Sequence, residues 1–188
     1  MQNPKRAVYN RFDEKLDILS DFLTKSGAKG RNARDLETGV AWLLWMLGFS
    51  VAHLGGTGRT QDAADLIATT PTGHFAVIEC TTGLLKAENK LSLLIGRAEQ
   101  VRLGVVASNN KHLRVLPIMV TSKTRAEVSA DLEQAERLGV LVITSENLER
   151  AIATTLVLPN PEKMYDDSWQ TVEAAKAKYE TQGTAQPS

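Results

Sequence analysis

Residues 64–83, ADLIATTPTGHFAVIECTTG, restrict the possible folds more than any other stretch, because they predict a β-hairpin. Two short apolar runs, DLIA and HFAVIE, flank a Pro-Thr-Gly turn, which is the pattern of two antiparallel strands. Asp65 stands near the start of the first run, and Glu79 ends the second. If the register centres on the turn, both carboxylates lie at the same end of the strand pair. They would repel each other there unless a positive group lies between them.

Helical and strand patterns continue on both sides of this hairpin. The spacing of apolar residues predicts helices over residues 12–24, 33–47, 86–102, 125–138, 145–156 and 167–179. Alternation predicts a strand over 49–54, and uninterrupted apolar runs predict buried strands over 115–121 and 140–144. Ser145 is expected to cap the helix that follows the last strand. From residue 33 the order is αβββαβαβα, which predicts an α/β fold with a central mixed β-sheet flanked by helices.

The pattern divides the chain into three parts. Residues 1–32 hold an N-terminal helix and a basic, glycine-containing linker, and residues 33–158 form the main domain. Residues 159–188 hold a C-terminal helix and a polar tail, TQGTAQPS, that we expect to be disordered. A chain of 188 residues is long enough for one substantial core.

Composition excludes some locations and leaves the charge pattern open. No apolar run approaches the roughly 20 residues of a membrane span, and MQNPKRAVYN lacks the apolar core of a signal peptide. The single cysteine, Cys80, suits a reducing, cytoplasmic location. The net charge is zero, but bases exceed acids eight to four over residues 1–34, and acids exceed bases eleven to five over 126–180. This asymmetry indicates either one basic and one acidic face or a chance spread of solvated charges.

The two carboxylates of the hairpin have two interpretations. A hard cation such as Mg²⁺ would hold them together, because it needs only one or two carboxylates besides water and substrate phosphates. Alternatively, each acid separately caps a loop or pairs with a surface base. Glu37 adds a third carboxylate at the edge of the apolar stripe of helix 33–47, where it needs a partner.

The run ETGVAWLLWMLGFSVAHLGG, with QDAADLIATTPTGHFAVIECTTG after it, resembles the PD-(D/E)XK nuclease superfamily and, within it, the Mrr-type restriction endonuclease-like group. That pattern has a Glu on the first helix, an Asp and a Glu on successive strands, and often a Gln on the next helix. Glu37, Asp65, Glu79 and Gln100 occur here in that order. The later run LGVLVITSENLERAI resembles the closing strand and helix of the same fold, so the resemblance covers roughly residues 33–157.

The resemblance implies a restriction endonuclease-like fold and a metal-dependent endonuclease that hydrolyses the phosphodiester bonds of DNA. Asp65, Glu79 and the backbone carbonyl of Cys80 would hold Mg²⁺, with Mn²⁺ as a substitute. Glu37 would bind or orient the attacking water, or hold a second metal. The resemblance further implies DNA as the partner and a homodimer or a place in a larger complex.

The sequence departs from the superfamily at the motif lysine, which is replaced by Thr81. Either catalysis is lost, or a lysine comes from the next helix, a migration that is known in the superfamily. Lys86, Lys90, Arg97 and Gln100 lie within about 80° of one another on that helix. Lys90 is our first candidate for the missing lysine and Lys86 the second. The same stripe equally suits a DNA-facing or solvated surface, and Arg97 and Arg59 are candidate phosphate contacts.

Two other functions compete with the nuclease. A catalytically inactive module of the same fold would bind nucleic acid or a protein partner, and the missing motif lysine favours it. An unrelated α/β binding domain is the second alternative. His53, His74 and His112 show no metal-ligand spacing and are expected to be surface or internally bonded residues.

Overall fold

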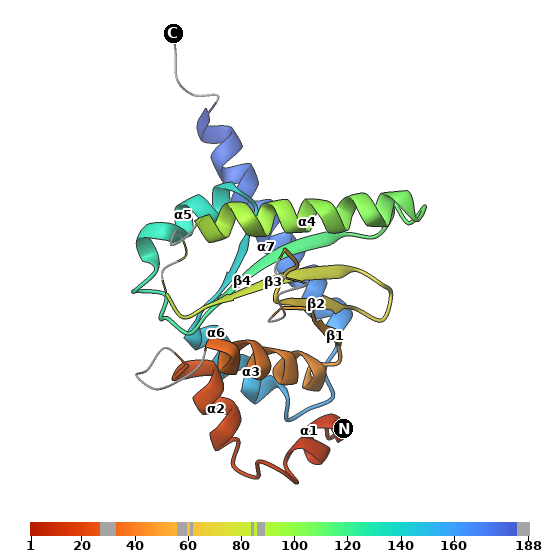
Figure 1. Cartoon of the computed structure of the whole chain (residues 1–188), viewed down its shortest axis with the longest axis vertical. Coiled ribbons are helices and arrows are strands. Elements are labelled where there is room, and N and C mark those ends of the chain that lie inside the picture. Colours follow the sequence, from red (N-terminus) through yellow and green to blue (C-terminus); the bar gives the residue numbers. More distant parts are fainter. Residues whose placement is uncertain (27–32, 56–59, 61, 84, 86–88, 184–188) are drawn as a thin grey trace.

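The computed structural model describes residues 1–26, 33–55, 60, 62–83, 85 and 89–183 (Figure 1). The helices are α1 (Pro4–Tyr9), α2 (Asp17–Thr24), α3 (Ala33–Met46), α4 (Lys90–Ala107), α5 (Ser129–Arg137), α6 (Ser145–Thr154) and α7 (Pro161–Gly183). The strands are β1 (Ser50–His53), β2 (Leu66–Thr69), β3 (Phe75–Thr81), β4 (Val115–Thr121) and β5 (Leu141–Ile143).

The strands form one mixed sheet in the order β1-β2-β3-β4-β5. The first three are antiparallel neighbours, whereas β3, β4 and β5 run parallel. Parallel neighbours need long crossovers, and α4 and α5 provide them. Figure 1 shows α4 above the sheet and α3 and α6 below it, with α7 passing behind. The α/β fold with a mixed sheet between helices is therefore confirmed.

Alternating side chains of β3 divide the interior into two cores. Ala76, Ile78 and Cys80 pack in the core cluster between the sheet and α3. Val77 packs in the cluster between the sheet and α4. The N-terminal helix α2 belongs to the first cluster through the buried side chains Leu19 and Leu23. Its close approach to α3 depends on Gly39, where a Cβ atom would lie 3.0 Å from the Cβ of Phe22.

Several helix ends differ from the predicted ones because of capping. The helix expected over residues 12–24 begins only at residue 17, because the Asp13 carboxylate accepts hydrogen bonds from the N–H groups of Ile18 and Leu19. The short α1 was not predicted. Ser145 is not the cap of α6: Thr144 is, in a capping box with Asn147.

The two longest helices extend beyond the predicted ranges. The helix expected over residues 86–102 is described from Lys90 to Ala107, with residues 86–88 outside the described ranges. The C-terminal helix begins at Pro161, which suits the first turn of a helix, and continues to Gly183. It thus includes the start of the tail expected to be disordered, and residues 184–188 lie outside the described ranges.

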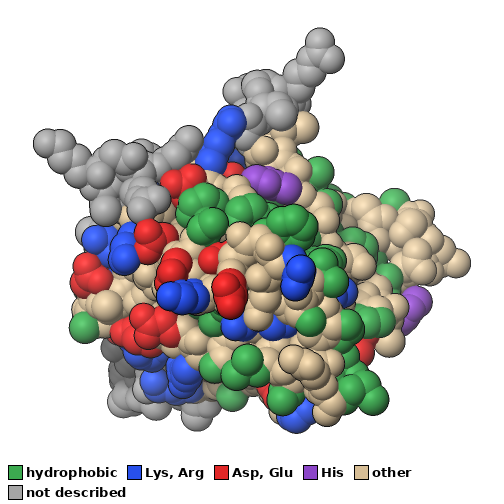
Figure 2. All heavy atoms as spheres, turned by 90° about the horizontal axis from the view of Figure 1, so that it is seen from below, with side chains coloured by type: hydrophobic (Ala, Val, Ile, Leu, Met, Phe, Trp, Pro, Cys, Tyr) green, Lys and Arg blue, Asp and Glu red, His purple; other side chains and the backbone are tan. Residues whose placement is uncertain are grey.

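The described surface is mixed in character. On the face shown in Figure 2, basic and acidic side chains are interspersed with hydrophobic ones, so this face carries no field of a single sign. None of the described helices has both the length and the apolar character that a membrane crossing requires.

Candidate active site at the end of the hairpin

The register of the hairpin places Asp65 and Glu79 at the same end of the strand pair, as predicted. Leu66 pairs with Ile78, Asp65 directly precedes Leu66, and Glu79 directly follows Ile78. Glu79 is only 6% exposed, and Asp65 is half-buried. Glu79 shares the sheet face of Val77, two residues before it, so its carboxylate lies on the side covered by α4.

Asp65 is fixed by backbone contacts on two sides. Its Oδ2 accepts a hydrogen bond of 2.7 Å from the N–H of Cys80, and its backbone carbonyl accepts 3.0 Å hydrogen bonds from Leu54 and Gly55. A Cβ atom on Gly55 would lie 2.9 Å from the Cα and 3.0 Å from Oδ1 of Asp65. Only glycine therefore fits where the chain leaving β1 crosses this carboxylate.

Glu79 is paired with a cation from α4. Its Oε1 accepts a hydrogen bond from Nη1 of Arg97, whose Nε donates to the backbone carbonyl of Asp62 at 3.2 Å. Arg97 thereby joins β3 to the segment that leads into β2. Lys90, the first residue of α4, adds a second positive charge near both acids, because its charge acts to lower the pKa of Asp65 and of Glu79.

Burial and mutual repulsion perturb these carboxylates. Burial raises the pKa of Glu79 to about 7, and the charge of Asp65 adds to the rise, while Arg97 and Lys90 oppose it. Burial also raises the pKa of Asp65 against the opposing Cys80 hydrogen bond, and Glu37 raises it further. Burial raises the pKa of the Cys80 thiol well above its ordinary value, so the thiol stays protonated and belongs to the core.

Glu37 reaches the same end of the sheet from the opposite face. It lies on α3 and pairs with His53, the last residue of β1, at 3.0 Å between Oε2 and Nε2. His53 is thus an internally bonded residue, as expected, although its pairing with Glu37 was not predicted. The available signal was the strand register, since His53 pairs with Leu66, the neighbour of Asp65.

Thr81 stabilises the turn that follows β3. Its hydroxyl is buried and accepts a 3.2 Å hydrogen bond from the N–H of Gly83, closing the turn after β3. Thr121, its partner in the parallel register, does the same with Lys123 at 3.1 Å. Thr81 brings no charge to the acids, and among the described residues the cations near them are Lys90 and Arg97.

Among the other predicted site residues, Gln100 does not join this cluster. Gln100 lies exposed on α4, about one turn beyond Arg97. Arg59 and Lys86 lie outside the described residues. His74 accepts a 3.1 Å hydrogen bond from the N–H of Arg114 and stacks on Tyr165, which makes it an internally bonded residue, as expected.

The donor set partly matches a magnesium site. Within the described ranges, no three His, Cys, Asp or Glu side chains lie together as metal ligands, so Glu37 does not complete a three-acid group in this conformation. Magnesium needs only one or two carboxylates, which Asp65 and Glu79 supply. The N–H and C=O of one strand residue point to the same neighbouring strand. Because the N–H of Cys80 faces Asp65, its carbonyl faces the same end of β2. These oxygen donors fit a hard cation.

A comparison with protein-family models finds no match for this chain, and neither does a comparison with curated proteins.

Proposed function

We propose that the protein is a metal-dependent nuclease that hydrolyses phosphodiester bonds of DNA. The observation that supports this proposal most is the convergence of Asp65 and Glu79 at one end of the hairpin, with the cations Lys90 and Arg97 beside them. Burial raises the pKa of both carboxylates, and carboxylates with perturbed pKa values cluster at functional sites.

The architecture supports a restriction endonuclease-like fold as the finer assignment. The order αβββαβαβα, implied by the resemblance to PD-(D/E)XK nucleases, agrees with the elements from α3 to α6. The positions of three acids support this assignment: Glu37 lies on the first helix of this unit, Asp65 directly precedes β2, and Glu79 lies within β3.

In the proposed mechanism, side chains from both faces of the sheet take part in hydrolysis. Bound Mg²⁺ would stabilise negative charge on the scissile phosphate and acidify the attacking water. Asp65, Glu79 and the carbonyl of Cys80 would hold that cation. Lys90 places positive charge where negative charge develops on the phosphate in the transition state. Glu37, oriented by His53, receives or directs the proton of the water.

A binding module without catalysis is the second candidate, and two observations favour it. Arg97 engages the carboxylate of Glu79, so the cation that neutralises this acid belongs to the protein itself. Thr81, at the position of the motif lysine, is committed to a turn. This module would bind nucleic acid or a protein partner through the basic residues of α4.

A nicking assay on supercoiled plasmid separates the two candidates. We expect wild type to nick DNA with Mg²⁺ or Mn²⁺ and to lose this activity in chelator. Asp65→Asn and Glu79→Gln should lose at least 100-fold in rate while keeping wild-type circular dichroism spectra. Glu99→Gln is the matched control, since Glu99 is an exposed acid of α4 that pairs with Arg102.

Absence of cleavage by wild type on duplex, single-stranded and branched DNA with either metal contradicts the nuclease. Retained DNA binding in gel shifts under the same conditions would then support the binding module. If Asp65→Asn, Glu79→Gln and Glu99→Gln are equally active, any observed cleavage does not depend on Asp65 and Glu79, and the proposed site is wrong.

A further inference from the structure

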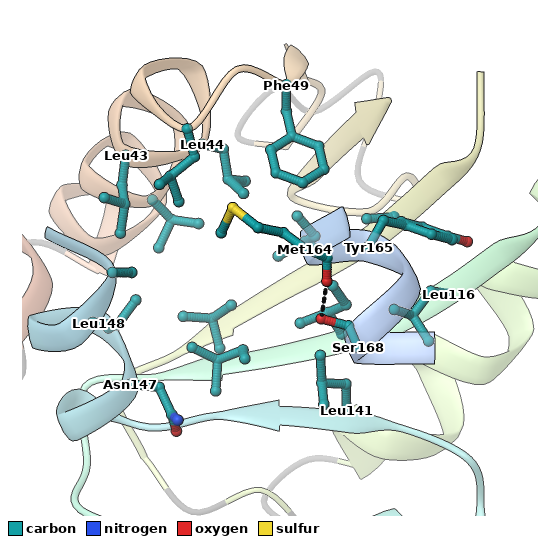
Figure 3. A pocket seen from close by; sticks show the side chains of 18 residues that line it. Leu43, Leu44, Phe49, Leu116, Leu141, Asn147, Leu148, Met164, Tyr165 and Ser168 are labelled. Atoms are coloured by element: carbon teal, nitrogen blue, oxygen red, sulfur yellow. Dashed lines mark hydrogen bonds between the residues drawn. The ribbon is translucent and has the colours of Figure 1, made fainter. Parts of the chain in front are cut away.

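A cavity of about 140 Å³ lies between the sheet and three helices, on the sheet face opposite to that of Glu79 (Figure 3). Leu43 and Leu44 of α3 form one wall, Leu148 of α6 a second, and Met164 of α7 a third, with strand residues such as Leu116 as the floor. Figure 3 shows these side chains pointing into a common space. None of the proposed catalytic residues lines it.

Two apolar clusters occupy this sheet face. One cluster lies between the sheet and α3. The other consists of Leu116 of β4 with Tyr165 and Val172 of α7. Ile118 packs against both, and the cavity occupies the space between them. Ala151 of α6 is a small residue in its lining and leaves room that a larger side chain would fill.

The lining is almost entirely apolar, and the oxygens of its few polar side chains already bond within the protein. The side-chain oxygen of Asn147 accepts a 3.0 Å hydrogen bond from the N–H of Thr144. Ser168 donates to the carbonyl of Met164 at 2.8 Å, and the Tyr165 hydroxyl donates to the carbonyl of Phe75 at 3.1 Å. A buried water needs two to four polar partners, so a cavity of this chemistry stays dry.

We propose that this cavity is a binding site for a small hydrocarbon group of about benzene's size, either an aromatic ring or the end of an alkyl chain. A dry cavity of about 150 Å³ with aliphatic and aromatic walls holds benzene, which is close in size and lining to this one. The occupant gains dispersion contacts with apolar walls that the protein's own side chains leave uncovered. Its binding ties α3, α6 and α7 to one another and is independent of metal or DNA.

Thermal unfolding with benzene and, separately, 1-hexanol tests the proposal. We expect the melting temperature of wild type to rise with ligand concentration, because a ligand of the folded state stabilises it by mass action. Ala151→Leu fills the space, so its melting temperature should not respond to either ligand. Ala153→Leu is the matched control on the exposed side of the same helix and should respond like wild type. A response to only one compound identifies ring or chain as the occupant.

Methyl NMR gives a second readout that does not depend on stability. Benzene should shift the signal of Met164, which lines the cavity, and leave that of Met119, which is buried in the other core. If Ala151→Leu does not fold, Ser168→Leu fills the site from α7. The proposal is overturned if neither compound stabilises wild type, if the filled variant responds equally, or if both methionine signals move alike.

Discussion

Substitutions of two single residues, Lys90 and Thr81, distinguish a catalytic protein from a binding module. If Lys90 supplies the missing positive charge, Lys90→Ala should lower turnover by about 100-fold or more, with DNA affinity reduced less than about tenfold. The reason is that this cation acts on charge present only in the transition state. Single-turnover cleavage and gel shifts on the same preparation measure the two effects, and equal losses in both would make Lys90 a simple phosphate contact.

Thr81→Lys is the converse variant, but the structure predicts a cost. The new side chain must leave the buried position of Thr81, and the N–H of Gly83 loses its hydrogen bond. If wild type is inactive and Thr81→Lys gains cleavage, the site has kept its geometry and lost only its charge.

Glu79 makes stability depend on pH in a defined window. Its pKa is about 7 in the folded protein and 4.5 as the ordinary value, so the folded state holds the proton more tightly than the unfolded state. Folding is therefore favoured below about pH 4.5, and stability declines as pH rises toward about 7 and then levels. In Glu79→Gln, the fall in melting temperature from pH 5 to pH 8 should be smaller than in wild type. An unchanged fall, matching that of Glu99→Gln, would contradict this.

Substitutions of two glycines, one crowded and one in open space, test how the elements pack. Gly55→Ala forces a Cβ against the backbone of Asp65 and should lower the free energy of unfolding by about 1–3 kcal/mol. Gly104 lies within α4 with nothing within 4 Å of its added Cβ, so Gly104→Ala should raise it by about 0.5–1 kcal/mol. Urea unfolding measures both, and a shift of the same sign in the two variants would refute the packing argument.

A helix or strand could be predicted from the sequence where a single local pattern specifies it. The uninterrupted run at 115–121 gave strand β4 with the predicted ends, and the Pro-Thr-Gly turn gave the hairpin register that joins Asp65 to Glu79. Helix ends were harder, since Thr144 and Ser145 are adjacent and both suit a cap. The pair of Glu37 and His53 could not be predicted from periodicity, because it depends on how α3 packs on β1.

The distribution of charge over the whole molecule determines how strongly DNA affinity would depend on salt. The positive charges near the acids come from Lys90 and Arg97 of α4, so binding should rely on a limited number of phosphate contacts. We expect affinity for duplex DNA to fall linearly on a logarithmic scale between about 50 and 200 mM salt. Fluorescence anisotropy with a labelled duplex measures the slope. An affinity independent of salt would count against nucleic acid as the partner.

The order of strands in space repeats their order along the chain. No strand has to be inserted between two that are already paired, so each new strand adds to an open edge left by the one before. Assembly during synthesis can therefore proceed from the N-terminal side, with the antiparallel strands closing first through short connections and the parallel ones following their helices. The acids of the hairpin would meet before the second half of the sheet has formed.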